Sequence, residues 1–188
     1  MPTNDATIAD RYRTIAGTFT RRVSEVPDDA WDNQSPVPEW TTRDVVAHLV
    51  GWVPGMIAAG SDVVLPVGPP VEDDPLGAWT TMSDAIQEIL DDPGVGERRF
   101  SHPQAGDHPL DAAIAMFVMG DVFMHTWDLA RAAGLDDTLD PDIAADMYEG
   151  MLPLDDMLRQ SGQYGPRVEV PEDARAQDKL MAFVGRQP

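Results

Sequence analysis

Three side chains in this 188-residue sequence have the types and spacing to hold a metal ion: His48, Asp121 and His125. Asp121 and His125 are four residues apart, which places two side chains on one face of a helix, one turn apart. Two imidazoles and a carboxylate form the ligand set of many catalytic zinc sites, and non-haem iron sites use the same ligand types. Such a set leaves coordination positions open, where a bound water, thiol or carbonyl can be polarised or deprotonated.

The segment that carries Asp121 and His125 is predicted to be a helix from about residue 109 to Ala133, with Gly134 as the left-handed residue after its end. At about 100° per residue, an arc about 100° wide on this helix holds its apolar face. Its members are Ile114, Phe117, Val118, Asp121, His125 and Asp128. Because this arc must face the protein interior, the carboxylate and the imidazole are carried inward together, and an unpaired buried carboxylate is costly. Asp128 would then orient a ligating imidazole or, more simply, anchor a loop.

His48 belongs to a second predicted helix, which has the clearest start in the sequence. Thr41 is the expected N-cap and Asp44 completes a capping box, while Trp40 and Val45 are placed for a hydrophobic staple. His48 lies at the border of the apolar stripe of this helix. It joins Asp121 and His125 only if the two helix faces meet.

The spacing alone leaves simpler interpretations open. An Asp-x-x-x-His pair on a helix is more often a surface ion pair, and an inward-facing histidine is more often a hydrogen-bonded core residue than a ligand. The other two histidines, His102 and His108, fall in a polar segment and are expected to be solvent-exposed. The five tryptophans are expected to anchor the core and loops.

The helices that must position these residues follow from hydrophobic periodicity and from breaks rich in Pro, Gly and Asp. The predicted helices span residues 7–26, 41–59, 76–91, 109–133, 142–158 and 172–184. Residues 92–108 are predicted to be a loop and residues 167–170 a short extended piece. We therefore predict an all-α protein, a four-helix bundle with long crossover loops and extra short C-terminal helices, in which residues 1–188 form one domain.

The composition excludes several classes of protein. The formal net charge is −20, from 33 acidic and 13 basic residues, and such a surface repels nucleic acid and anionic membranes. No apolar run approaches the roughly 20 residues that span a bilayer, and the acidic start lacks the features of a secretory signal. Without cysteine there is no disulfide, thiolate ligand or thiol nucleophile. We expect a cytoplasmic protein that binds neither nucleic acid nor membranes.

Three segments of the sequence resemble the DinB/YfiT-like metalloprotein superfamily, in an actinobacterial branch related to the N-terminal domain of mycothiol-dependent maleylpyruvate isomerase. They read EWTTRDVVAHLVGW from Glu39, GDVFMHTWDLARAAGLDDTLD from Gly120, and YGPRVEVPEDARAQDKLMAFVGRQP from Tyr164. The likeness runs in order over most of the chain. Arg186, near its end, matches the family's ending, and the sequence suggests no physical role for it.

This resemblance implies a four-helix bundle with one divalent ion, commonly zinc or nickel, between the helices. The family's first ligand falls on His48, and its acidic ligand and the histidine four residues later fall on Asp121 and His125. The related isomerase has glutamate at the acidic position; aspartate is one methylene shorter, so the position or affinity of the ion would differ. Family members with an assigned activity are often thiol transferases or isomerases that use mycothiol or bacillithiol as a metal-bound thiolate, whereas many others have no established activity.

From the resemblance we expect a metal-dependent S-transferase or isomerase, with a mycothiol-type thiol as cosubstrate and a small electrophile as partner. The isomerase carries a further C-terminal domain that contributes to its active site, and the absence of one here argues against maleylpyruvate isomerase activity itself. Two alternatives stay open: a non-catalytic metal-binding module with a structural or sensing role, and a bundle that has lost its metal. A homodimer is compatible with such a bundle, although no seam in the sequence assigns its interface.

Overall fold

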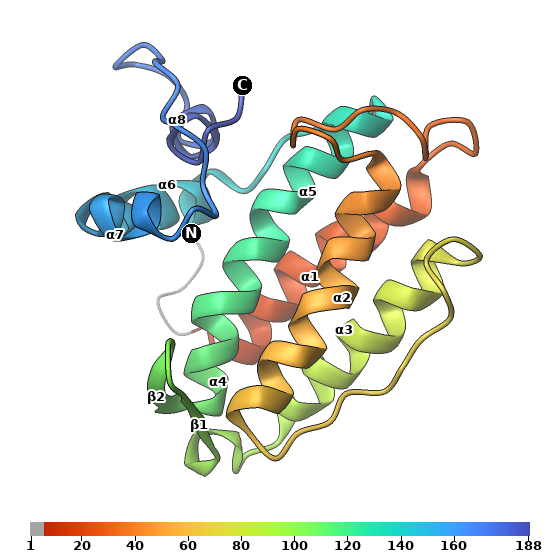
Figure 1. The fold of residues 1–188 in the computed structure, drawn as a ribbon, viewed down its shortest axis with the longest axis vertical. Coiled ribbons are helices and arrows are strands. Elements are labelled where there is room, and N and C mark those ends of the chain that lie inside the picture. Colours follow the sequence, from red (N-terminus) through yellow and green to blue (C-terminus); the bar gives the residue numbers. More distant parts are fainter. Residues whose placement is uncertain (1–5) are drawn as a thin grey trace.

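The computed structural model describes residues 6–188, and four helical segments run side by side in it as a bundle (Figure 1). They are α1 (Ile8–Glu25), α2 (Thr42–Gly60), α3 (Pro75–Asp91) and a composite last segment of α4 (Leu110–Ala113), η2 (Ile114–Met119) and α5 (Gly120–Ala133). α1 and α2 each pack against both α3 and α5. The predicted all-α four-helix bundle is confirmed.

Local sequence signals set the helix ends at the positions that matter for the site. The predicted capping box is present: the Thr41 backbone N–H donates to Asp44 Oδ2 at 2.8 Å, and the Asp44 backbone N–H donates to Thr41 Oγ1 at 3.2 Å. A second capping box, between Thr7 and Asp10, starts α1. Gly134 follows α5 with a φ of +70°, the left-handed conformation predicted for it. Helix α2 and the composite segment from α4 to α5 therefore begin and end close to their predicted residues.

The bundle core is apolar and contains several fully buried aromatic side chains. Phe19 of α1 meets Trp79 of α3 edge to face, with ring centroids 4.5 Å apart. The buried hydroxyl of Tyr12 lies 3.2 Å from Ser83 Oγ, so its polar end is also satisfied. Burying each such large side chain is worth about 1.5–3 kcal/mol. This core holds α2 and α5 in the contact on which the site depends.

The last bundle helix is not a regular α-helix throughout, because η2 is a π-helical segment. A π-turn contains more residues than an α-turn, so a rotation of 100° per residue does not carry across it. The regular rotation from which the apolar arc was predicted therefore does not hold across η2. The arc nevertheless faces the interior, since Ile114 and Val118 are buried and Phe117 is half-buried against the core. Beyond η2, Asp121 and His125 lie on regular α-helix, where their four-residue spacing keeps its meaning.

Part of the segment predicted as a loop is a β-hairpin. Strands β1 (Arg99–His102) and β2 (Gly106–Pro109) pair antiparallel, with Phe100 opposite His108. The prediction that His102 and His108 are solvent-exposed is also wrong, since both are half-buried. Each strand has four residues and Phe100 is their one fully buried side chain, so the sequence shows no alternation from which to infer a strand.

The C-terminal elements form a smaller unit beside α5 (Figure 1), in which α6 packs against α8. They are α6 (Pro141–Met151), η3 (Leu152–Leu154), α7 (Asp155–Gln160) and α8 (Ala176–Phe183). The helix predicted over residues 142–158 is thus divided by the short 3-10 turn η3, which contains Pro153. The last predicted helix is shorter than expected, because residues 172–174 form a turn. The piece predicted as extended lies beside α8, where the Val168 N–H donates to the Ala182 carbonyl at 2.9 Å.

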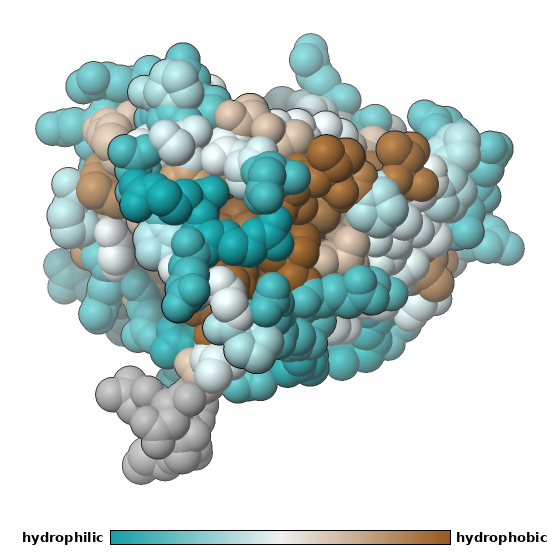
Figure 2. All heavy atoms as spheres, turned by 90° about the horizontal axis from the view of Figure 1, so that it is seen from below, coloured by the Kyte–Doolittle hydropathy of each residue, from teal (hydrophilic) through white to brown (hydrophobic). Residues whose placement is uncertain are grey.

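The face of the molecule shown in Figure 2 is mostly hydrophilic, with its main apolar patch near the centre of the view and smaller apolar areas toward the edges. Charged side chains on such a surface are consistent with the net charge of −20. None of the helices within residues 6–188 is both long and apolar enough to cross a membrane.

Candidate metal centre

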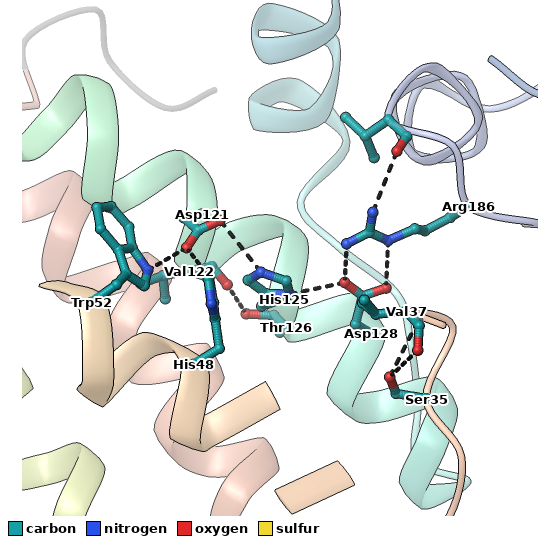
Figure 3. Close-up of polar contacts among 11 residues, drawn as sticks. Ser35, Val37, His48, Trp52, Asp121, Val122, His125, Thr126, Asp128 and Arg186 are labelled. Atoms are coloured by element: carbon teal, nitrogen blue, oxygen red, sulfur yellow. Dashed lines mark hydrogen bonds and ion pairs between the residues drawn. The ribbon is translucent and has the colours of Figure 1, made fainter. Parts of the chain in front are cut away.

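The packing of α2 against α5 brings His48, Asp121 and His125 together (Figure 3). Asp121 Oδ2 lies 3.0 Å from His48 Nε2, and Asp121 Oδ1 lies 3.4 Å from His125 Nε2. One potential ligand atom from each of the three residues falls within 4.8 Å of the others. Four tetrahedral ligands at about 2.0–2.2 Å from a zinc ion are themselves about 3.3 Å apart, so this set fits a metal ion with only small movements.

Asp121 is held between the two helices. Besides His48, its Oδ2 atom accepts a hydrogen bond of 2.9 Å from Trp52 Nε1, one turn further along α2. Burial alone would raise the pKa of Asp121, but the hydrogen bonds with His125 and His48 outweigh it and hold this pKa below its usual range. The carboxylate is therefore charged and oriented, as a metal ligand must be.

His125 is buried, with a carboxylate at each ring nitrogen. Its Nδ1 lies 2.9 Å from Asp128 Oδ2, which leaves Nε2 facing Asp121. Burial lowers the pKa of His125, but the hydrogen bonds to Asp121 and Asp128 raise it more strongly, to about 9. In the metal-free protein at neutral pH, His125 is thus protonated on both nitrogens. A metal ion at the centre would replace the proton on Nε2.

Asp128 is fully buried and is itself held from behind by Arg186, which follows α8. Arg186 Nε donates to Asp128 Oδ1 at 3.1 Å, and Arg186 Nη2 donates to Oδ2 at 2.9 Å. Burial tends to raise the pKa of Asp128, and the hydrogen bonds from His125 and Arg186 lower it overall. Of the two roles considered for Asp128, the structure shows a direct contact with the imidazole. It also gives Arg186 a partner that the sequence did not suggest.

Trp40 covers both imidazoles. Its ring centroid lies 4.7 Å from that of His48 and 5.7 Å from that of His125, and the two imidazoles are 4.9 Å apart, nearly perpendicular to one another. Trp40 immediately precedes the capping box of α2, so the start of that helix fixes where the indole lies. Sequence reasoning assigned Trp40 a staple contact with Val45 and missed its position against the histidines.

Two further residues of the site were not predicted, Trp52 and Tyr164. Trp52 was open to inference, because it is four residues from His48 on the same helix. Tyr164 lies between α7 and α8; burial raises the pKa of its hydroxyl, and the negative charge of Asp121 adds to the rise. The C-terminal unit thus adds the charge of Arg186 next to the centre, and it places Tyr164 close enough for the charge of Asp121 to affect its hydroxyl.

The hairpin histidines do not join the centre. Within residues 6–188, the group of convergent ligands consists of His48, Asp121 and His125. His102 Nδ1 accepts hydrogen bonds from the backbone N–H groups of Gln104 and Ala105, and His108 Nε2 lies 2.8 Å from the Ala105 carbonyl oxygen. These two side chains stabilise the hairpin turn.

Residues 12–130 match the mycothiol maleylpyruvate isomerase N-terminal domain family. The chain belongs to this family. The matched range contains the three convergent residues and Asp128, whereas Arg186 lies beyond it. The membership confirms the resemblance inferred from the three sequence segments.

The chain is also similar along most of its length to two uncharacterized proteins of Mycobacterium tuberculosis, one from strain CDC 1551 / Oshkosh and one from strain ATCC 25618 / H37Rv. Each is 30% identical over 178 residues, which cover 93% of this chain and 95% of the relative. No solved structure matches the chain.

Proposed function

We propose that this protein binds one divalent metal ion through His48, Asp121 and His125, and that it is an S-transferase or isomerase acting on a small electrophile with a mycothiol-type thiol. The observation that carries the metal site is the convergence of two imidazoles and a charged carboxylate from two packed helices. The family, named for a mycothiol-associated isomerase, supports the choice of thiol.

We propose zinc or nickel as the ion, as the resemblance to the DinB/YfiT-like superfamily implies, and imidazole nitrogens suit both. A bound divalent ion would lower the pKa of a coordinated thiol and so supply a thiolate nucleophile at neutral pH. Three protein ligands leave room for such a thiol.

The charges around the centre favour an anionic ligand. Once His125 gives up its extra proton, the buried charges are the negative ones of Asp121 and Asp128 and the positive one of Arg186. A divalent ion would make the sum positive by one unit. A thiolate would then neutralise the centre, which a neutral thiol or water would not.

The surrounding residues orient the ligands. Asp128 accepts the Nδ1–H of His125 and thereby fixes the ring with Nε2 toward the centre. Trp52 holds Asp121 Oδ2, and Trp40 packs on both imidazoles and restricts their rotation.

We place the protein in the cytoplasm, and we propose that its partners are small molecules and not nucleic acid or membranes. The net charge of −20 supports the exclusion of nucleic acid and membranes, because binding to either of them would need clusters of Lys and Arg. A homodimer is also compatible with the bundle, and a measurement of molecular mass in solution would test it.

Elemental analysis and calorimetry test the proposal. We expect about one zinc or nickel ion per chain in the wild type, and we expect mycothiol to bind to the metal-loaded protein but not to the metal-free protein. His48→Ala should bind neither the ion nor mycothiol. His102→Ala is the matched control, because it removes an imidazole in the hairpin and should retain both.

Equal binding of mycothiol by wild type and His48→Ala would exclude the thiol mechanism, and a metal content near zero in the wild type would exclude the metal site. A protein that binds its ion and loses much of its thermal stability to a chelator, yet turns over no thiol and electrophile, would instead be a non-catalytic metal-binding module.

A further inference from the structure

Helix α8 ends in a turn that aims the chain back toward α5. The Gly185 N–H donates to the Ala182 carbonyl at 3.1 Å, and the Arg186 N–H donates to the Met181 carbonyl at 2.9 Å. Together these bonds form a Schellman motif, in which the residue after the helix cap takes a left-handed conformation. Gly185 has a φ of +91°, which glycine adopts without strain. The motif determines where the next residue, Arg186, points.

The segment before α8 is packed tightly against this turn. A Cβ atom on Gly185 would lie 2.8 Å from the Cα of Gly165, so the close approach of these two backbones requires glycine at position 185. Arg159 donates to the carbonyl oxygens of Gly165 and Phe183, and its guanidinium lies 4.9 Å from the Phe183 ring centroid. Arg167 lies over the same ring at 4.4 Å. These contacts therefore fix the position of the turn after α8 relative to residues 159–167.

From this turn Arg186 reaches a carboxylate 58 residues earlier in the chain. Its side chain is 13% exposed, and the Asp128 side chain that it contacts is fully buried. The pair is bidentate, which fixes the plane of the carboxylate as well as its position. The other partner of Asp128 Oδ2 is His125 Nδ1, so an unbroken chain of polar contacts runs from Arg186 to a proposed metal ligand (Figure 3).

We infer that Arg186 is a positioning residue for the metal centre: by holding Asp128 it fixes the His125 imidazole, and this couples the docking of the C-terminal segment on α5 to metal binding. The inference rests on the proposed metal site. It adds that residues beyond the family's matched range take part in forming that site.

Two general properties support the coupling. Groups that hydrogen-bond a metal-ligating imidazole through its other nitrogen typically change metal affinity by 10–100-fold when they are removed. A coupling free energy is also reciprocal, so an ion that binds better when Arg186 is seated must itself favour the seated segment. Metal binding should therefore slow amide hydrogen exchange in the region from Tyr164 to Arg186.

The experiment compares wild type, Arg186→Gln and Arg186→Lys with the control Arg175→Gln. Arg175 is near the start of α8, its side chain is 66% exposed, and its ion pair with Asp178 is remote from the centre. Three quantities are measured for each protein. They are the zinc dissociation constant by chelator competition, the visible spectrum of the cobalt-loaded form, and hydrogen exchange in residues 161–188 with and without zinc.

Because Arg186 acts through Asp128 and does not touch the imidazole itself, we expect Arg186→Gln to show the lower end of the typical range, with zinc binding about 10-fold weaker. We also expect a changed cobalt spectrum and loss of the zinc-dependent protection of residues 161–188. Arg186→Lys should recover part of the affinity, because it restores the charge without the bidentate geometry. Arg175→Gln should match the wild type in all three measurements.

The outcomes separate the two proposals. If the wild type binds zinc, and Arg186→Gln binds it equally well with an unchanged cobalt spectrum, the inference fails while the metal site stands. If the wild type does not bind zinc, both fail. Should Arg186→Gln not fold, the wild type decides alone, since the inference is wrong if zinc leaves hydrogen exchange in residues 161–188 unchanged.

Discussion

The two helices that meet at the centre contribute its histidines in different ways. On α5, His125 is buried and has a carboxylate at each ring nitrogen, one of which is held in turn by Arg186. On α2, the His48 side chain is 29% exposed and meets Asp121 through Nε2. The same residue type with the same proposed role thus lies in two different electrostatic settings.

Because of this difference, we expect the two histidines to contribute unequally to the stability of the fold, although both have the same proposed role in metal binding. On α5, charges of both signs are buried together, and removal of one leaves another without its partner, which is costly. On α2, the imidazole is partly solvated, so its loss leaves little unpaired. We therefore expect the α5 ligand to be needed for both folding and metal binding, and the α2 ligand for metal binding alone.

The largest expected effect comes from exchanging the two histidines for alanine in separate variants. His125→Ala leaves Asp121 and Asp128 without the charge between them and should lower the free energy of unfolding of the metal-free protein by about 3–5 kcal/mol. His48→Ala should lower it by less than about 1 kcal/mol. Urea denaturation of the two metal-free variants measures both values.

If the proposed metal site is correct, both variants should contain no zinc or nickel, which elemental analysis checks. Equal stability of the two variants would contradict the proposed difference, because the buried network on α5 would then contribute no more to the free energy of unfolding than His48 does.

The pH dependence of the metal-free protein sharpens the same contrast. The pKa of folded His125 is about 9, above its ordinary value of 6.5. A group whose pKa is raised by folding contributes stability that is complete below the unfolded value and is lost as the pH rises through the folded value. The free energy of unfolding should therefore fall between about pH 6.5 and 9, by a few kcal/mol.

His48→Ala is the matched control for this measurement and should show the same decline, because both carboxylates beside His125 remain. In the wild type, zinc affinity should rise over the same range, since the ion competes with a proton on His125. A free energy of unfolding that is flat from pH 6.5 to 9.5 would contradict the assignment.

The smallest expected effect on metal binding concerns Trp52, which supports the carboxylate from the α2 side. Trp52→Phe removes the hydrogen bond from Nε1 to Asp121 Oδ2 while it keeps an aromatic ring in place. One hydrogen bond to a charged group is worth about 1.5–3 kcal/mol when buried, and Asp121 is partly exposed, so we expect about 1 kcal/mol of lost stability and a several-fold loss of zinc affinity. Trp31→Phe, a tryptophan substitution in a loop outside the centre, is the control for zinc affinity and should leave it unchanged.

Much of the α5 contribution could be predicted from sequence because it is local. Asp121, His125 and Asp128 are separated by four and three residues, and on a regular helix this spacing alone places them on one face. The capping box at Thr41 likewise placed His48 on α2 at a known turn. That α2 and α5 are neighbours was conditional on the bundle packing, and the resemblance to the family favoured it.

Predictions failed where the local pattern was absent or misleading. The π-helical segment η2 changes the rotation of the chain before Asp121, and no residue type in the sequence marks it. The strands around Phe100 are too short and too exposed to alternate. The role of Trp52 was missed although its spacing from His48 was available, because a tryptophan is expected to anchor the core and not to bind a carboxylate.

The sequence by itself determined which side chains each helix presents, since helical spacing and capping depend on residues only three or four positions apart. Tertiary structure decided what those side chains meet: the two imidazoles across Asp121, Trp40 over both rings, and Arg186 behind Asp128. These contacts join residues 58 or more positions apart, or depend on how one helix is rotated against another, and both follow from the packing of the whole core, which no local pattern records.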